Sequence, residues 1–184
     1  VVLPAGFRAS LTSGQAAGLA SASSADAMQA VLDSLEMAGE VRMAIDEACS
    51  RLDTADTRFA VRSSALAADS ATHSFAGQLE SFLNVEPSRV ADRVAAVWRS
   101  GFTERIVAYR RGAGLAPLPD APAVIVQRMV AAEVSGVAFS ADPVSGRRAV
   151  TVVSALPGLG EALVGGIATG DTWRAGPGDS IIER

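Results

Sequence analysis

A segment rich in proline and glycine, residues 112–122, divides the chain into two parts with different hydrophobic patterns. It contains three prolines and two glycines, which interrupt both helices and strands. Before it, apolar residues recur largely at helical spacing, whereas after it short β-rich runs follow one another. We therefore expect an α+β fold with two lobes, residues 1–114 and residues 115–184.

The first lobe shows helical periodicity in three places. Residues 24–37 have this spacing, with Ser24 as the N-cap, and a second pattern covers residues 41–52. The longest pattern covers residues 87–109, where Gly101 predicts a bend.

Strand-like composition is found in both lobes. In the second lobe a turn sequence at residues 142–146 joins two of the runs. The stretch 149–168 predicts a strand, a loop and a short helix. The predicted strands are residues 58–62, 79–85, 123–130, 134–140 and 148–155.

Composition narrows the function classes. Hydrophobic residues make up 49% of the chain and charged residues 20%, which is typical of a globular protein. The net charge of -4 disfavours nucleic-acid binding.

The single Cys49, within a helical pattern, is expected to be a buried thiol in a reducing cytoplasm. Glycines, a proline and a glutamate interrupt the one apolar stretch, so no membrane span is expected. The N-terminus resembles no signal peptide, and we expect the chain to begin within a longer protein.

Arg62 and the small residues that follow it form a candidate phosphate site. An arginine at a strand end supplies a rigid fork of donors, and a glycine-containing loop supplies free backbone N–H groups. A surface loop whose serines and glycines only permit turns has the same composition. Composition alone leaves both interpretations open.

Several motifs, in order, resemble those of the PEP-utilising dikinase family. Together they are similar to the N-terminal ATP-grasp domain, also called the PEP/pyruvate-binding domain, of phosphoenolpyruvate synthases and rifampicin phosphotransferases. Residues 141–148 are more similar to the rifampicin phosphotransferase branch. The resemblance implies an ATP-grasp fold whose third subdomain is missing here. The motifs are residues 59–65, 74–78, 81–85, 105–110, 124–130, 134–139, 158–161 and 171–173.

The resemblance implies roles for four residues near the phosphates of ATP. Arg62 would contact the phosphates and act in catalysis. Gly77 and Gln78 would belong to the loop that closes over them, and Ser81 would keep the hydroxyl of a family threonine. The first lobe would thus carry the phosphate-binding loop.

The second lobe would carry the hinge that reads adenine. The resemblance assigns this role to Gln127, Met129 and Val130, where an amide bonds the base edge and apolar side chains pack its faces. Met129 and Val130 could instead be ordinary core strand residues. Glu161 could lie near the ribose or a metal, or could simply be an acidic residue that favours a helix start.

The chain lacks some groups that the family uses. All 16 basic residues are arginine, so the family's phosphate-binding lysine has no counterpart here. ATP chemistry needs Mg²⁺, and we expect its ligands outside this chain. The family's relay histidine belongs to a separate swivelling domain, and His73 is expected to be an ordinary solvated loop residue.

The predicted function is the ATP-binding portion of a dikinase. It would transfer the β-phosphate of ATP through a histidine on another domain to a rifamycin-type antibiotic or to pyruvate, held by an acceptor-substrate domain. The isolated chain is expected to be inactive. One alternative is a degenerate stand-alone module that binds a nucleotide or a partner without catalysis. Another is a β-rich interaction module.

Overall fold

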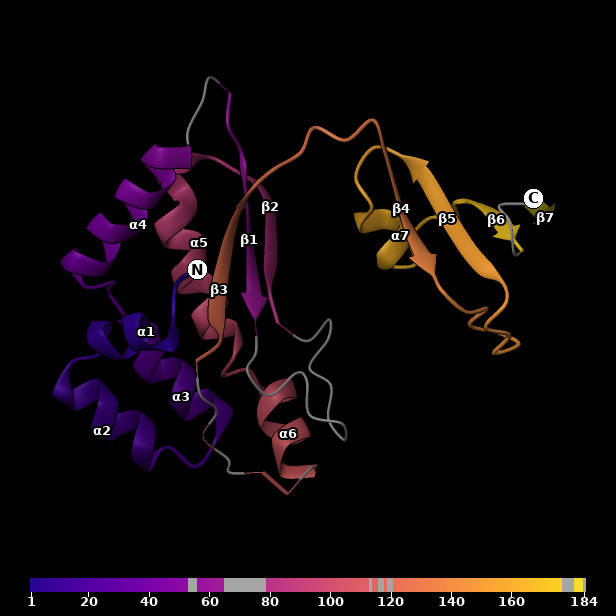
Figure 1. Cartoon of the computed structure of the whole chain (residues 1–184). Coiled ribbons are helices and arrows are strands. Elements are labelled where there is room, and N and C mark those ends of the chain that lie inside the picture. Colours follow the sequence, from indigo (N-terminus) through magenta and orange to yellow (C-terminus); the bar gives the residue numbers. More distant parts are fainter. Residues whose placement is uncertain are drawn as a thin grey trace. The chain divides into compact units, whose positions relative to one another are not determined.

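The computed structural model describes residues 1–52, 56–64, 79–112, 114–115, 118 and 121–176, and the backbone of residues 181–183. The chain forms two compact units, Val1–Met129 and Val130–Arg184 (Figure 1). Helices and antiparallel sheets confirm the predicted α+β class. The division between the units lies after Met129, further along the chain than the expected boundary after Gly114. The reason is that the strand that follows the proline-rich segment pairs within the first unit.

Helices form most of the first half of the first unit. The predicted N-cap is confirmed, since the Ser24 side chain accepts a hydrogen bond from the Ala27 amide. The sequence patterns did not predict α1 and α2, which have only 7 and 9 residues and therefore show few hydrophobic repeats. The helices are α1 (Pro4–Ser10), α2 (Ser13–Ser21), α3 (Ala25–Leu32), α4 (Gly39–Leu52), α5 (Val90–Ser100) and α6 (Glu104–Gly112).

The long helical pattern is broken at Gly101, where a bend was predicted. A 3₁₀ turn, Pro87–Arg89, leads into α5, and α6 begins at Glu104. A Cβ at position 101 would lie 3.0 Å from Cδ of Pro122, so this close approach favours glycine. Two helices, α5 and α6, thus form where the sequence showed one continuous helical pattern.

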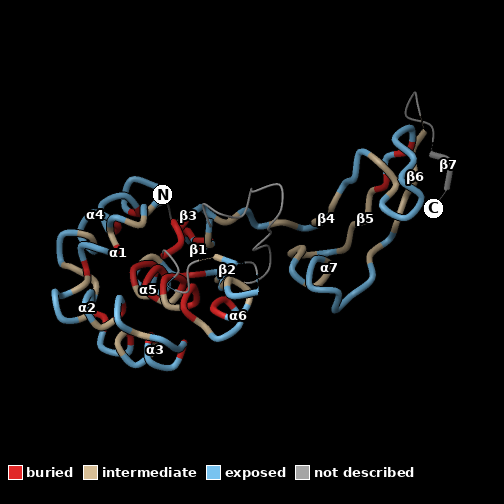
Figure 2. Tube along the Cα trace, turned by 90° about the horizontal axis from the view of Figure 1, so that it is seen from below, coloured by how far each residue is buried: buried red, intermediate tan, exposed pale blue. Residues whose placement is uncertain are grey.

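A three-stranded antiparallel sheet completes the first unit. Its strands are β1 (Phe59–Ser64), β2 (Ser81–Val85) and β3 (Ala123–Arg128), in the order β2-β1-β3. Helix α5 packs against all three strands. Buried residues gather around α5, β1 and β3 (Figure 2).

Aromatic rings lie at the centre of the core of the first unit. The Phe7 ring stacks on that of Phe102 at 5.5 Å and meets Trp98 edge-on at 5.7 Å. Phe59 and Val61 of β1 belong to the same core and are 0% exposed. One face of the sheet is therefore fixed by a well-packed hydrophobic core.

The second unit is a four-stranded antiparallel sheet with one short helix, α7 (Glu161–Val164). The predicted strands near residues 134–140 and 148–155 are confirmed, as are the loop and short helix after them. Among its described residues only Val150 and Val152 are buried hydrophobics. The strands, in sheet order, are β4 (Val134–Phe139), β5 (Thr151–Pro157), β6 (Asp171–Ala175) and β7 (Ile181–Glu183).

The predicted turn between β4 and β5 is confirmed. The Asp142 carboxylate accepts hydrogen bonds from the Val144 amide at 2.9 Å and the Ser145 hydroxyl at 2.7 Å. Gly146, with φ of +72°, donates its N–H to the Asp142 carbonyl. The hydroxyl of Ser145 and the amide of Val144 lower the pKa of Asp142.

Within the part of the chain that the structure describes, no helix has the length and apolar character needed to cross a membrane.

Candidate functional site

Arg62 and Ser81 lie opposite each other in the first sheet. Arg62 of β1 is paired with Ser81 of β2 on one side and with Ile125 of β3 on the other. Residues directly opposite in antiparallel strands project from the same face. Both Arg62 and Ser81 are exposed. The structure thus brings together two side chains that the sequence assigned to the phosphates.

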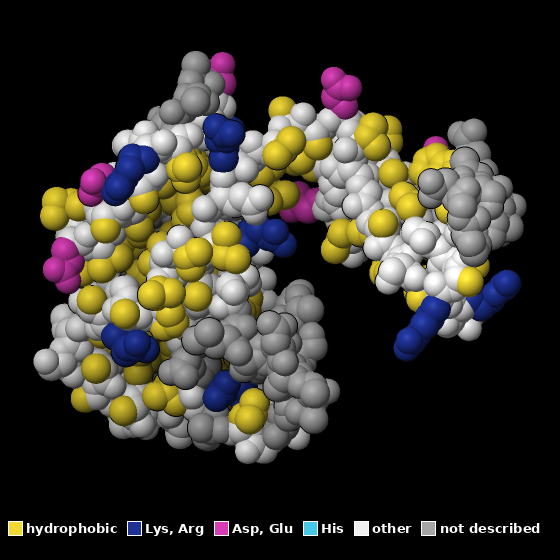
Figure 3. Space-filling model, viewed as in Figure 1, with side chains coloured by type: hydrophobic (Ala, Val, Ile, Leu, Met, Phe, Trp, Pro, Cys, Tyr) yellow, Lys and Arg dark blue, Asp and Glu magenta, His cyan; other side chains and the backbone are white. Residues whose placement is uncertain are grey.

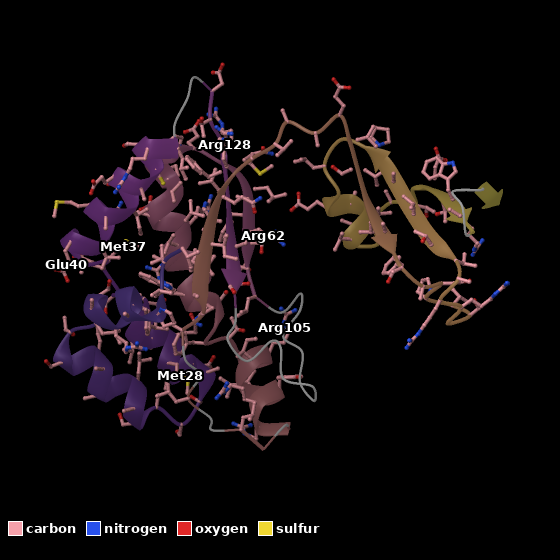
Figure 4. The ribbon with its side chains drawn as sticks, in the orientation of Figure 1. Met28, Met37, Glu40, Arg62, Arg105 and Arg128 are labelled. Atoms are coloured by element: carbon pink, nitrogen blue, oxygen red, sulfur yellow. The ribbon has the colours of Figure 1, made fainter. Side chains whose placement is uncertain are left out.

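Strand alternation explains why Arg62 is available to a ligand. Phe59 and Val61 point into the core, so Arg62, the next residue along, points to the opposite face. Figure 4 shows Arg62 on the side of β1 away from α1 and α4. A charged fork on a central, paired strand is held more rigidly than one on a loop.

Gln127 lies on the same face. It is paired with Ala60, two residues from Arg62 along β1, and it is exposed. Residues in this diagonal relation are about 7–8 Å apart, within reach of long side chains. The amide, the guanidinium and the Ser81 hydroxyl could therefore contact different parts of one extended ligand.

The two residues after Gln127 that were predicted to belong to the adenine hinge, Met129 and Val130, fall on either side of the division between the units. The Met129 amide donates to the Arg58 carbonyl at 2.8 Å, so the β1–β3 ladder extends one residue beyond β3. Met129 is half-buried, whereas Val130 begins the second unit and is 73% exposed. Val130 is therefore not a core strand residue.

Glu161 belongs to the second unit, where it is the first residue of α7. Its side chain is exposed, and no side chain caps the helix at Gly160. An acidic residue at this position is favourable for the helix dipole, although a four-residue helix has only a small one.

Three residues considered from sequence, Gly77, Gln78 and His73, lie outside the described residues. Cys49 is buried in α4, as predicted. In the described ranges no three side chains of His, Cys, Asp or Glu come together as a metal-binding group would require.

The sheet face that carries Arg62 contains two further residues, to which the sequence motifs gave no individual role. Ser64 follows Arg62 at the strand period of two and is exposed, and Ile125 is the partner of Arg62 in β3. The alternation of a strand from Arg62 could have indicated Ser64. Ile125 could be found only from the register between β1 and β3.

A second concave region of the first unit differs in chemistry. A groove of about 580 Å³ lies between the N-terminal residues, α1 and α4, and Val126 contributes to it from β3. Figure 3 shows hydrophobic side chains gathered there. Among the described residues that line it, Glu40 is the only one with a charged side chain. An apolar groove with a carboxylate does not suit a polyphosphate, so the candidate site is the sheet face with Arg62.

A guanidinium, a hydroxyl and an amide on one face of a sheet provide the groups expected in a nucleotide-binding domain. The sequence profile of the family described as "Pyruvate phosphate dikinase, AMP/ATP-binding domain" matches residues 10–184. The chain belongs to this family of ATP-binding domains, which confirms the resemblance seen in its motifs.

Curated relatives of the chain are phosphotransferases and synthases. The rifampicin phosphotransferase of Streptomyces sviceus is 43% identical over 147 residues, which are 79% of this chain and 16% of that protein. The phosphoenolpyruvate synthase of Pyrococcus furiosus is 38% identical over 153 residues, 80% of this chain and 19% of that protein. The chain therefore spans less than a fifth of the length of these relatives.

Proposed function

We propose that this chain binds ATP for a dikinase that passes the β-phosphate to a histidine on a swivelling domain. The observation that carries the proposal is the common face of Arg62, Ser81 and Gln127 in the first sheet. Family membership supports ATP as the ligand. The phosphohistidine domain and the acceptor-substrate domain are proposed to lie outside this chain.

In this proposal Arg62 binds phosphate oxygens through its planar fork, and the Ser81 hydroxyl donates to a neighbouring oxygen. Gly77 and Gln78, which precede Ser81 in the sequence, contribute to the same phosphate contacts. The role of these groups is to orient the polyphosphate and to offset its negative charge.

The adenine base is proposed to lie at Gln127, Met129 and Val130, with Glu161 serving the ribose or a metal. Mg²⁺ would neutralise charge on the transferred phosphates, and its principal ligands are proposed to lie outside this chain. The isolated chain would consequently bind nucleotide weakly and transfer nothing. A cytoplasmic location is proposed because the reaction consumes ATP and the single cysteine is a buried thiol.

The acceptor is proposed to be a rifamycin-type antibiotic or pyruvate. The support is the names of the relatives, rifampicin phosphotransferase and phosphoenolpyruvate synthase. A second candidate function, a degenerate module that binds a nucleotide or a partner without catalysis, is favoured by the absence of lysine from the whole sequence.

Titration of MgATP into the isotope-labelled chain, followed by NMR, tests the proposal because this method detects weak binding. We expect shift changes at β1, β2 and the end of β3, and a loss of affinity of about tenfold or more in Arg62→Ala. Arg8→Ala, an exposed arginine in α1, is the matched control and should bind as the unmutated chain does. Equal affinity of Arg62→Ala and the unmutated chain would contradict the assignment.

A further inference from the structure

We propose that Ser100, at the end of α5, is a positioning residue that keeps Ser81 opposite Arg62. The inference rests on the proposed function, because it concerns how the phosphate-binding face is held in register. Ser100 lies in the helical layer and does not contact the ligand in this proposal.

The Ser100 hydroxyl links α5 to the start of β2. It donates to the Val97 carbonyl at 2.8 Å and accepts a hydrogen bond from the Glu80 amide at 3.1 Å. Ser100 is only 8% exposed, so water competes little for this bond. Glu80 immediately precedes Ser81. The bond therefore fixes the backbone next to Ser81, the residue that is proposed to bind phosphate.

The end of α5 is itself held in place by α3 and the turn after it. The Arg99 guanidinium donates to the carbonyls of Leu32 at 3.2 Å and Leu35 at 3.1 Å. In return, the Gln29 amide donates to the Arg99 carbonyl at 3.1 Å. Ser100 therefore projects from a fixed point of the helical layer.

Strand β2 needs such an attachment because its ladder with β1 is irregular. The register shifts between Phe59 and Val61, and Asn84 has a positive φ of 55°. A slip of one residue would turn Ser81 to the opposite face of the sheet, away from Arg62. The Ser100–Glu80 bond resists this slip at the end of the strand where Ser81 lies.

A second contact ties β2 to α5 further along the strand. The Arg93 guanidinium lies 4.7 Å from the centre of the Phe82 ring. This contact orients Phe82 on the core side, but it involves a flexible side chain. The backbone hydrogen bond from Glu80 is thus the more rigid of the two attachments.

The test compares Ser100→Ala, Ser100→Thr and the control Ser50→Ala. Ser50 also donates its hydroxyl to a carbonyl of its own helix, Asp46, but it is exposed. The readouts are NMR affinities for MgADP and for adenosine, which lacks phosphates, together with hydrogen exchange at the Glu80 amide. A purely structural role would move both affinities together.

For Ser100→Ala we expect exchange at Glu80 to become about tenfold faster and MgADP affinity to fall about three- to tenfold, with adenosine affinity unchanged. Ser100→Thr, which keeps the hydroxyl, should restore both values. In a Ser81→Ala background, Ser100→Ala should cause no further loss of MgADP affinity.

If Ser100→Ala does not fold, Glu80→Pro tests the same bond, because it removes the donor and leaves α5 intact. It should lower the affinity for MgADP and leave the affinity for adenosine unchanged. Equal losses for MgADP and adenosine, or effects of Ser100→Ala and Ser81→Ala that simply add, would overturn the positioning role. Absence of nucleotide binding by the unmutated chain would instead overturn the proposed function, and this inference with it.

Discussion

Arg62 illustrates how the position of a residue in a sheet decides what its side chain can do. The preceding residue, Val61, is 0% exposed in the core, so strand alternation turns the guanidinium to the other face. Register then places Ser81 beside it and Gln127 diagonally across. At this scale, we expect single substitutions to separate the proposed phosphate contacts from the proposed base contacts.

Gln127→Ala should weaken ATP and adenosine by the same factor, roughly fivefold, because its amide is proposed to contact only the base. Arg62→Ala should weaken ATP alone. NMR titration with both ligands measures the two factors. Arg128→Ala is the control, since Arg128 pairs with Phe59 and projects from the opposite face of β3.

Gly136→Ala should destabilise the second unit. A Cβ at this position would lie 2.5 Å from the Ser154 carbonyl oxygen and 2.9 Å from the Ala155 Cβ, so β4 and β5 would have to separate. We expect faster amide exchange across both strands. Gly39→Ala is the comparison, because among the described residues nothing lies within 4 Å of a Cβ there. Unchanged exchange in Gly136→Ala would show that the strands can absorb the methyl group.

At the scale of elements, the turn between β4 and β5 depends on an ionised Asp142. Its carboxylate accepts from Ser145 and Val144, which lowers the pKa of Asp142 in the folded chain. A lowered folded pKa means that the stabilisation is complete above the ordinary carboxyl pKa and is lost as the pH falls through the lowered value.

Acidification should therefore increase amide exchange at Val144 in the unmutated chain. Asp142→Asn, which keeps an acceptor but does not ionise, should remove this pH dependence. An NMR titration from neutral pH into the acid range follows the amide and the carboxyl carbon together. A carboxyl carbon that titrates at or above its ordinary pKa would contradict the role given to the two hydrogen bonds.

For the whole molecule, the described core lies almost entirely in one unit. Apart from Val150 and Val152, every described buried hydrophobic residue belongs to Val1–Met129. That unit also contains a complete three-stranded sheet with α5 packed against it. Large buried apolar area is the main source of folding free energy.

A chain of residues 1–129 should therefore fold alone, with a single cooperative thermal transition and dispersed NMR signals. Its amide shifts should match those of the same residues in the whole chain. The comparison is a chain ending at Gly114, which lacks β3 and should lose cooperativity, because Val124 would be missing from the core. Cooperative unfolding of both chains would show that β3 is dispensable.

Local patterns in the sequence determined much of this protein. Helices α3 and α4 and the Asp142 turn follow from periodicity, capping and turn chemistry between near neighbours. The ordered motifs likewise indicated the family, which the profile match confirms. Arg62, Ser81 and Gln127 were named from those motifs as candidates, without any indication that they share a face.

Only the tertiary structure decided which residues meet. Strand β3 follows the proline-rich segment yet joins β1, so the units divide after Met129. The common face of Arg62, Ser81 and Gln127, and the bond from Glu80 to Ser100, depend on the register of strands and on packing between distant segments. These contacts join residues far apart in the chain. Local periodicity carries no information about which distant strand each strand pairs with.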